Sequence, residues 1–310
     1  MKRKEFIKTS SAGLAGLSLS PLLFAGASHQ KTVSPDKPHY KKGYMLGTFP
    51  DRSSYSIDEQ FAMLKLAGFH GVEPDSGLNR DEVIAARDAH GLEIPSVVCS
   101  THWSSPVSSR DASVREAGRK GLETALRDAH AYGASCVLFV PGVVSEAVPY
   151  EEAYYRSQEE IKKLIPLAEE LDVTIAIENV WNQFLLSPME AARYVDEFES
   201  DKVGWYFDIG NIMNYGWPQH WIRTLGSRIV MIHIKEFDFT KRNQEGPYAG
   251  FNVNYLDGDN NWPEIMAALR EVGYKGGYGI AEPPYRDADM DHQQWLIQHI
   301  SGRMDTIFAM

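Results

Sequence analysis

The chain has 310 residues, of which 43% are hydrophobic and 24% are charged, and it contains only 2 cysteines. These proportions are those of an ordinary globular protein and exclude the collagen-like, intrinsically disordered and disulfide-scaffold classes. The formal net charge of −11 argues against a nucleic-acid-binding surface, which needs a basic excess to neutralise phosphates.

Residues 1–27 resemble an export signal. A basic start that contains Arg3 and Lys4 precedes a weakly apolar stretch, which ends in small residues at positions 25–27. The pattern is similar to a twin-arginine signal in which Arg3-Lys4 replaces the arginine pair, so we expect a periplasmic protein. A membrane-anchoring helix is the alternative. However, the glycines and the proline inside this stretch make it a poor helix, and it is short for a bilayer.

Removal of this segment would make the remaining chain more acidic. Because residues 1–27 carry four cationic side chains and one acidic one, the remainder would have a net charge of −14. Residues 28–43 are polar and contain prolines, and we predict that they form a linker to a folded domain over residues 44–310. No other stretch approaches transmembrane length, so we expect no stable membrane span after signal removal.

From residue 44 onward, short apolar runs alternate with longer amphipathic ones. The short runs are rich in β-branched or aromatic residues and almost unbroken in apolarity, as expected of parallel strands covered on both faces. The predicted strands are 44–48, 71–73, 94–99, 136–140, 174–178, 204–208, 229–234 and 278–282. The predicted helices are 57–67, 81–90, 113–132, 150–171, 188–198, 221–225, 263–272 and 291–308.

This series of strand–helix units, without a break in composition, predicts a single-domain α/β fold, the (β/α)8 TIM barrel. An open doubly wound sheet is the alternative, but no glycine-rich phosphate fingerprint follows the first predicted strand. Cys99 and Cys136 are expected at opposite ends of adjacent parallel strands, beyond bonding distance, and therefore as unpaired core residues.

Four consecutive predicted strands end in a side chain that can bind a metal. Glu178, Asp208, His233 and Glu282 each follow an apolar run. The carboxyl ends of the strands form the active-site face of a barrel, so we expect these side chains around one half of its mouth. Their oxygen and nitrogen donors suit Mn²⁺, Mg²⁺ or Co²⁺. A single such residue often caps a helix or forms an ion pair, but converging carboxylates repel one another unless a cation lies between them.

The order of these residues resembles the xylose-isomerase-like superfamily of TIM-barrel sugar isomerases and epimerases. The segments that carry the likeness are Glu178-Asn179, Asp208-Ile209-Gly210-Asn211, His233-Ile234-Lys235-Glu236 and Glu282. Within this superfamily, the segment 99–106, which contains His102, and the loop 256–262 are similar to members of the L-xylulose 5-phosphate 3-epimerase type. The resemblance covers residues 43–310.

This resemblance implies that Glu178, Asp208, His233 and Glu282 bind one divalent cation. Mn²⁺ is the first expectation, with Mg²⁺, Co²⁺ or Zn²⁺ as alternatives. The resemblance also implies that Glu178 and Glu282 form the catalytic acid/base pair. The chemistry is consistent with general principles, because a metal bound to a carbonyl and a neighbouring hydroxyl stabilises an enediolate. Two carboxylates on opposite faces can then remove and return a proton with inversion, as an isomerase or epimerase requires.

Further residues near the expected strand ends are predicted to bind the substrate. Each also has a structural alternative, such as core packing, a loop position or an ion pair. The predicted substrate-binding residues are Glu73, His102, Trp103, Trp181, Asn211, Lys235 and Arg286. Lys235 shares a strand face with His233, since side chains two residues apart in a strand point to the same side.

The export signal and the acidity bear on the substrate. Sugar phosphates are intracellular metabolites, so we expect an exported protein to act on a non-phosphorylated carbohydrate, in line with its negative charge. The alternatives are a lyase or hydratase that removes the same α-proton from a keto-glycoside, and a non-catalytic carbohydrate-binding barrel. A DNA-repair endonuclease of the same superfamily is disfavoured, because Asn211 stands where a histidine ligand is needed. The sequence leaves open whether the chain forms a homo-oligomer.

Overall fold

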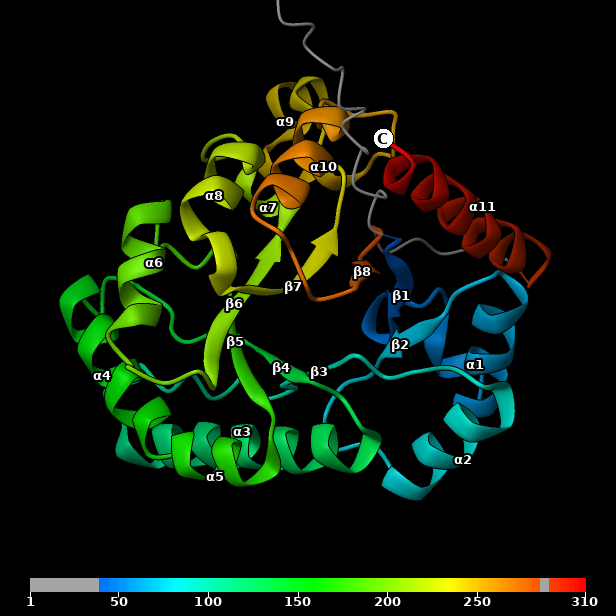
Figure 1. The fold of residues 1–310 in the computed structure, drawn as a ribbon. Coiled ribbons are helices and arrows are strands. Elements are labelled where there is room, and N and C mark those ends of the chain that lie inside the picture. Colours follow the sequence, from blue (N-terminus) through cyan, green and yellow to red (C-terminus); the bar gives the residue numbers. More distant parts are fainter. Residues whose placement is uncertain (1–38, 285–289) are drawn as a thin grey trace, which may run out of the picture. The chain divides into compact units, whose positions relative to one another are not determined.

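The computed structural model describes residues 39–284 and 290–310. Within these residues, parallel strands form the centre of the molecule and helices surround them, which confirms the predicted single-domain TIM barrel (Figure 1). The predicted signal peptide 1–27, most of the predicted linker 28–43 and the predicted substrate-binding residue Arg286 lie outside the described residues.

The strands are short and almost entirely buried, because one face packs on helices and the other fills the barrel. Their bounds are β1 Lys41–Met45, β2 Gly71–Glu73, β3 Ser96–Val98, β4 Cys136–Phe139, β5 Thr174–Glu178, β6 Val203–Asp208, β7 Ile229–Ile234 and β8 Tyr278–Ala281. The hydrogen-bonded order is β2-β1-β8-β7-β6-β5-β4-β3. Backbone hydrogen bonds from Val72 to Glu93 and from Ser76 to Val98 join β2 to the β3 side, so that the barrel is nearly closed.

At least one helix lies between successive strands, and several helices have clear capping residues at their ends. Their bounds are α1 Ile57–Leu66, α2 Arg80–His90, α3 Ala112–Tyr132, α4 Tyr150–Lys162, α5 Ile165–Leu171, α6 Pro188–Asp196, α7 Ile209–Ile212, α8 Pro218–Leu225, α9 Phe239–Glu245, α10 Trp262–Glu271 and α11 Met290–Phe308. Ser56 and Glu59 form a reciprocal capping box at the start of α1. Gly91 and Gly133 end α2 and α3 in the left-handed region, which favours glycine.

Some element bounds differ from those predicted. β1 begins at Lys41 instead of residue 44, because it pairs with β8 from Lys41 onward, and Leu46–Thr48 turn into a short 3-10 helix. The predicted helix 150–171 is two helices. Pro166 lies in the first turn of α5, where it lacks the N–H that would continue the hydrogen-bond ladder of α4.

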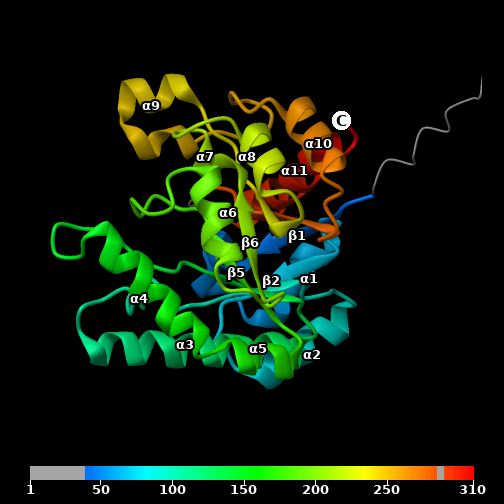
Figure 2. The same ribbon diagram turned by 60° about the vertical axis from the view of Figure 1, so that its left-hand side comes forward.

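Two short helices after β6 and β7 are not predicted from the sequence. α7 has 4 residues and α9 has 7, too few for hydrophobic periodicity to reveal them. α9 projects from the ring of helices at the upper left of Figure 2. Both helices belong to the connections that leave the carboxyl ends of strands, which is the end of a barrel where sites form.

The core has two layers, as the alternation of side chains along the strands requires. Fully buried Trp205 and Phe207 of β6 belong to the larger layer, between strands and helices. The cluster that fills the barrel is Val98, Cys136, Leu138, Ala176, Tyr206, Met231, Tyr278 and Ile280. Cys99 and Cys136 are buried and free, as predicted.

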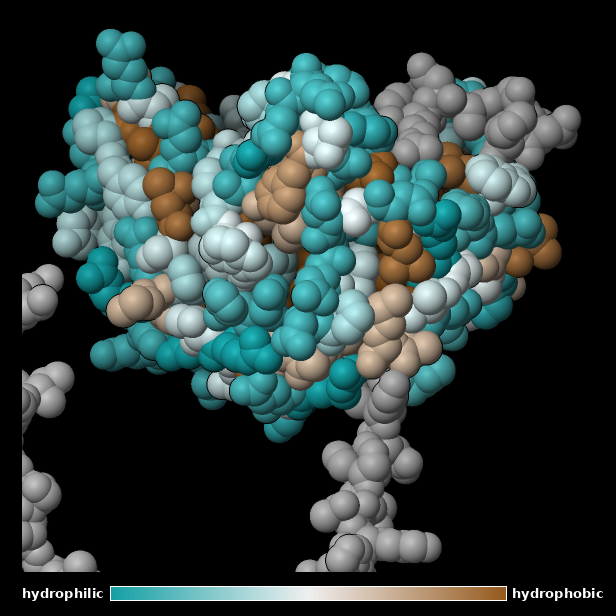
Figure 3. Space-filling model, turned by 90° about the horizontal axis from the view of Figure 1, so that it is seen from above, coloured by the Kyte–Doolittle hydropathy of each residue, from teal (hydrophilic) through white to brown (hydrophobic). Residues whose placement is uncertain are grey.

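Hydrophobic side chains form separate patches among hydrophilic ones on the face seen in Figure 3. In the part of the chain that the structure describes, no helix combines the length and apolarity needed to cross a bilayer. Four exposed aromatic residues, Trp103, Tyr215, Trp217 and Tyr248, lie in connections that follow β3, β6 and β7. Because these connections leave the carboxyl ends of strands, the four residues belong to the active-site face of the barrel.

Candidate functional site

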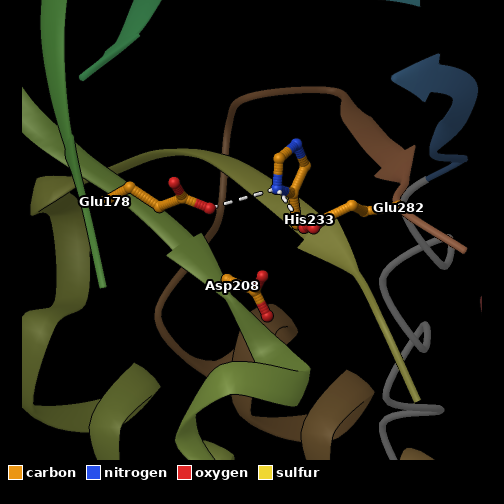
Figure 4. A group of neighbouring side chains, drawn as sticks. All are labelled: Glu178, Asp208, His233 and Glu282. Atoms are coloured by element: carbon orange, nitrogen blue, oxygen red, sulfur yellow. Dashed lines mark ion pairs between the residues drawn. The ribbon is translucent and has the colours of Figure 1, made fainter. Parts of the chain in front are cut away.

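The four predicted metal ligands converge at the carboxyl ends of β5 to β8. Glu178 and Asp208 are the last residues of β5 and β6, His233 lies in β7, and Glu282 follows β8 directly. The parallel register places Asp208 beside His233. One donor atom from each of the four residues lies within 4.8 Å of the others, and Figure 4 shows the side chains directed toward one another.

The imidazole of His233 is buried, and Glu73 contacts one of its two nitrogens. Its Nε2 lies 2.8 Å from Oε2 of Glu73. Its Nδ1 lies 3.0 Å from Oε2 of Glu282 and 3.3 Å from Oε1 of Glu178 (Figure 4). Neither of these contacts is a hydrogen bond, so among the described residues this buried nitrogen has no hydrogen-bond partner. A buried nitrogen that faces two carboxylates without a hydrogen bond fits a metal ligand.

The charges of the cluster also fit a divalent cation. Burial lowers the pKa of His233, but the charge of Glu73 and the close contacts of the ring with the carboxylates of Glu178 and Glu282 outweigh burial and raise this pKa well above its usual value. The imidazole therefore attracts a proton when no cation is present, and a bound cation would displace that proton. Carboxylate oxygens together with one imidazole nitrogen suit Mn²⁺, Mg²⁺, Co²⁺ or Zn²⁺.

Glu73, which we predict from the sequence to bind the substrate, lies beneath the ligands. Its side chain is fully buried, and it does not line the cavity described below. Oε1 accepts hydrogen bonds from Ser96 Oγ at 2.5 Å and from the Tyr206 hydroxyl at 2.6 Å, while Oε2 faces His233. Both oxygens are thus engaged inside the barrel. This arrangement suits a positioning residue for His233 better than a substrate contact.

We expect Glu73→Gln to weaken Mn²⁺ binding about 10–100-fold, because removal of a partner behind a ligating histidine loosens the orientation of its ring. Electron paramagnetic resonance titration of free Mn²⁺ measures this change. Glu93→Gln is the matched control, since Glu93 also accepts from a tyrosine and a cation, Tyr278 and Lys41, but at the opposite end of the barrel. Equal Mn²⁺ affinity in Glu73→Gln and Glu93→Gln would contradict the positioning role.

Lys235 adds a positive charge to the cluster. Its Nζ lies 2.6 Å from Oε1 of Glu282 and 3.3 Å from Oδ2 of Asp208. Burial alone would raise the pKa of Glu282, but the ammonium of Lys235 and the imidazole of His233 lower it below its usual value. For Asp208 and Glu178 burial dominates and raises the pKa. The carboxylates of Asp208 and Glu178 are therefore costly to keep charged, and an additional cation would relieve that cost.

A network of backbone and amide groups positions Asp208. Asn179 Oδ1 accepts from the Asp208 N–H at 3.1 Å, and Asn179 Nδ2 donates to the Asp208 carbonyl at 2.8 Å. Oδ1 of Asp208 accepts from the Asn211 N–H at 2.8 Å. The Asn211 amide donates to the carbonyl of Asn179 at 2.9 Å. Asn179 is a supporting residue that we do not predict from the sequence, and its position beside Glu178 was the available signal.

A cavity of about 430 Å³ lies at the barrel mouth beside the ligands, within the size range of small-molecule sites. The predicted residues that line it are His102, Trp103, Glu178, Trp181, Asn211, Lys235 and Glu282. The other lining residues are Met45, Val98, Leu138, Val180, Tyr248 and Phe251. The lining thus combines polar groups with aliphatic and aromatic side chains, as is typical of small-molecule sites.

His102 is a neutral group in the wall of this cavity. Its side chain is buried, and burial lowers its pKa to about 4. Nδ1 accepts a long hydrogen bond of 3.4 Å from the backbone N–H of Val140. The proton of the neutral ring then lies on Nε2, which can donate to a hydroxyl. The predicted role of His102 in binding a substrate hydroxyl stays a prediction that this geometry allows.

The two predicted tryptophans border the cavity in different ways. Trp103 is 52% exposed and meets the ring of His102 edge to face. Trp181 donates from Nε1 to the carbonyl of Asn211 at 2.9 Å, which holds its ring in place. The rings around Trp181 are Tyr215, Phe237, Tyr248 and Phe251. A fixed indole on a cavity wall is a suitable surface for the apolar face of a sugar.

Glu236 is a second supporting residue that we do not predict. It is buried, and its carboxylate accepts from Trp262 Nε1 and the Leu256 N–H, each at 2.7 Å, and from the Asn260 N–H at 3.2 Å. Burial raises its pKa despite these donors. Glu236 ties the loop 256–262 to the end of β7. An acidic residue one position after Lys235 was a signal, but its partners could not be identified from the sequence.

The fold and the site define a TIM-barrel protein with a candidate cation site and a cavity of small-molecule size at the carboxyl ends of its strands. Comparison with protein families agrees with this class. The model described as xylose isomerase-like TIM barrel matches residues 61–300, and the chain belongs to this family.

Similar proteins of this family include sugar epimerases. L-ribulose-5-phosphate 3-epimerase UlaE from Salmonella paratyphi C (strain RKS4594) is 25% identical over 199 residues, which cover 64% of this chain and 67% of that protein. A structure of D-psicose 3-epimerase in the presence of D-fructose has a TM-score of 0.70 at 19% identity, covering 86% of this chain and 97% of that one. The structure of 3-keto-D-glucoside 4-epimerase YcjR from E. coli has a TM-score of 0.68 at 17% identity, covering 87% of this chain and 100% of that one.

Proposed function

We propose that this protein is a divalent-metal-dependent isomerase or epimerase of a non-phosphorylated carbohydrate. The placement of Glu178 and Glu282 carries the proposal. Both line the cavity, from β5 and from the end of β8, and Nδ1 of His233 lies between them at 3.3 and 3.0 Å. Carboxylates on two sides of one substrate position can remove a proton from one face of a carbon and return one to the other. The family membership supports sugar chemistry of this kind.

Glu178, Asp208, His233 and Glu282 would hold the cation. When bound, a divalent cation stabilises the negative charge that develops on a carbonyl oxygen during α-proton removal. Lys235 adds a fixed ammonium in the same cavity, and it can stabilise an enediolate through hydrogen bonding and charge.

Other lining residues orient the sugar in this proposal. The Nε2–H of His102 donates to a hydroxyl, and the rings of Trp103 and Trp181 pack on C–H faces. Glu73 does not touch the substrate and keeps the imidazole of His233 in place.

The charge of the cavity favours a substrate without phosphate. Among the described residues, Lys235 is the one cationic side chain in the lining, and it already contacts Glu282 and Asp208. A phosphate group would face carboxylates without a free cation to pair with. We also propose export to the periplasm, on the pattern of residues 1–27.

Hydrogen exchange in D₂O tests the proposed function. The protein is loaded with Mn²⁺ and incubated with D-fructose, D-psicose, D-tagatose, their 6-phosphates, and the ketose disaccharides lactulose, isomaltulose and trehalulose. The sugars are analysed by NMR after removal of the metal. We expect deuterium at one carbon of at least one free sugar, only when metal is present. No exchange on any sugar would contradict the isomerase proposal. If a sugar phosphate exchanged faster than the free sugars, the proposal of a non-phosphorylated substrate would be wrong.

A further inference from the structure

A second cavity of about 600 Å³ lies at the same end of the barrel. One wall is the connection 213–217 between α7 and α8 together with the first two residues of α8, and the other contains Phe239, Asp259 and Asn261, which follow β7. The two walls are linked, because Nη1 of Arg242 in α9 lies 3.1 Å from Oδ1 of Asn214. This cavity is distinct from the one that contains the metal ligands, and the mechanism proposed above does not use it.

The lining of the second cavity combines aromatic faces with amides. Tyr215 and Trp217 are 44% and 64% exposed. Asn214, Gln219 and Asn261 supply amide donors and acceptors. Lysine and arginine are absent from the described residues of this lining. Exposed aromatic faces beside several amides suit a neutral ring with many hydroxyls, and they offer an anionic group no counter-charge.

Aromatic residues connect the second cavity with the first. The ring centroid of Trp181 lies 5.0 Å from that of Tyr248, which lines the first cavity, and 6.0 Å from that of Tyr215, which lines the second. A small hollow is lined by both Asn211 and Tyr215, and Asn211 also lines the first cavity. The hydrogen bond from Trp181 to the Asn211 carbonyl holds this partition in place. The two cavities therefore lie close together, because Trp181 lines the first and its ring contacts that of Tyr215, which lines the second.

We propose that the substrate is a two-ring carbohydrate, a ketose disaccharide. Its reacting ring occupies the first cavity, and its second ring packs against Tyr215 and Trp217 in the second. This inference rests on the proposed function, because it takes the first cavity as the place of reaction. A single ring would leave the exposed aromatic faces of the second cavity in water. Contacts to a non-reacting ring also provide binding energy that can orient the reacting one.

Calorimetric titration of the Mn²⁺-loaded protein tests this inference. The probes are D-fructose and three disaccharides that link fructose to a second ring through different oxygens: lactulose, isomaltulose and trehalulose. We expect at least one disaccharide to bind about tenfold more tightly than D-fructose, and Trp217→Ala to abolish that gain. The matched control is Tyr155→Ala on α4, because Tyr155 is exposed to a similar degree, 58%, and lines neither cavity. This variant should keep the disaccharide preference.

Three results would overturn the second-ring site. These are equal affinity for D-fructose and all three disaccharides, a disaccharide preference that persists in Trp217→Ala, and an equal loss of preference in Tyr155→Ala. Calorimetry reports binding without turnover, so the two proposals fail separately. Trp217-dependent disaccharide binding without any exchange in D₂O would refute the isomerase proposal and support the second-ring site. Exchange on D-fructose with no disaccharide preference would refute only the second-ring site.

Discussion

Replacing Glu178 or Glu282 with glutamine is expected to lower kcat about 10³-fold, the loss typical when a positioned proton-transfer group is removed. Glutamine keeps the size of the side chain and one acceptor oxygen, but it cannot take up a proton. Both residues also lie among the proposed metal ligands, within 4.8 Å of Asp208 and His233. We therefore expect the Mn²⁺ affinity to fall as well, and kcat is to be measured by D₂O exchange at saturating Mn²⁺.

Saturation with Mn²⁺ separates the two roles of these glutamates. If they act only as ligands, excess Mn²⁺ should restore kcat; if they transfer protons, the loss should persist. Glu271→Gln is the control, because Glu271 is an exposed glutamate on α10 paired with Arg223 and should keep full activity. Full metal-dependent exchange in both Glu178→Gln and Glu282→Gln would refute the proposed acid/base pair.

Removal of the metal is expected to lower the melting temperature by about 5–10 °C. A ligand present at about 100 times its Kd and bound only to the folded state adds about 2.7 kcal/mol of stability, which gives a shift of this size for a large domain. The physical cause is the convergence of the Glu178, Asp208 and Glu282 carboxylates with Nδ1 of His233 in a buried space. Differential scanning calorimetry with excess Mn²⁺ and with chelator measures the shift.

Asp208→Asn provides the matched variant for this measurement. Asparagine keeps the shape of the side chain and can retain the hydrogen bond from the Asn211 N–H, but it removes one charged ligand. We expect the difference in melting temperature between Mn²⁺ and chelator to be much smaller in Asp208→Asn. An identical melting temperature of the unmodified protein in both conditions would show that the cluster does not bind Mn²⁺.

Much of the fold is predictable because its signals are local. Strands that end in Glu178 and Asp208 are apolar almost throughout, as strands buried on both faces must be. Helix ends at Gly91 and Gly133 follow from the left-handed backbone that glycine favours. The elements that are wrongly predicted or not predicted at all lack such signals. The start of β1 depends on pairing with β8, and α7 and α9 are too short to show a period.

The candidate site likewise has features that the sequence predicts and features that it does not. Convergence of the four strand-end side chains could be predicted, because parallel strands of a barrel bring their carboxyl ends to one mouth. The environment of Glu73 could not be predicted in this way. Its carboxylate accepts from Tyr206, a residue 133 positions away in the chain, and this contact crosses the interior of the barrel. The sequence shows only an acidic residue at the end of β2, which fits a substrate contact as well as a support for His233.

Length, composition and local pattern alone determined the TIM barrel, the acidic net charge and the identity of the four candidate ligands. These depend on residue types and their spacing, which the chain carries without folding. Only the tertiary structure decided which nitrogen of His233 faces the carboxylates, where Lys235 places its charge and that a second cavity adjoins the first. The physical reason is that these features arise from contacts between side chains and connections far apart in the sequence, and closure of the barrel creates those contacts.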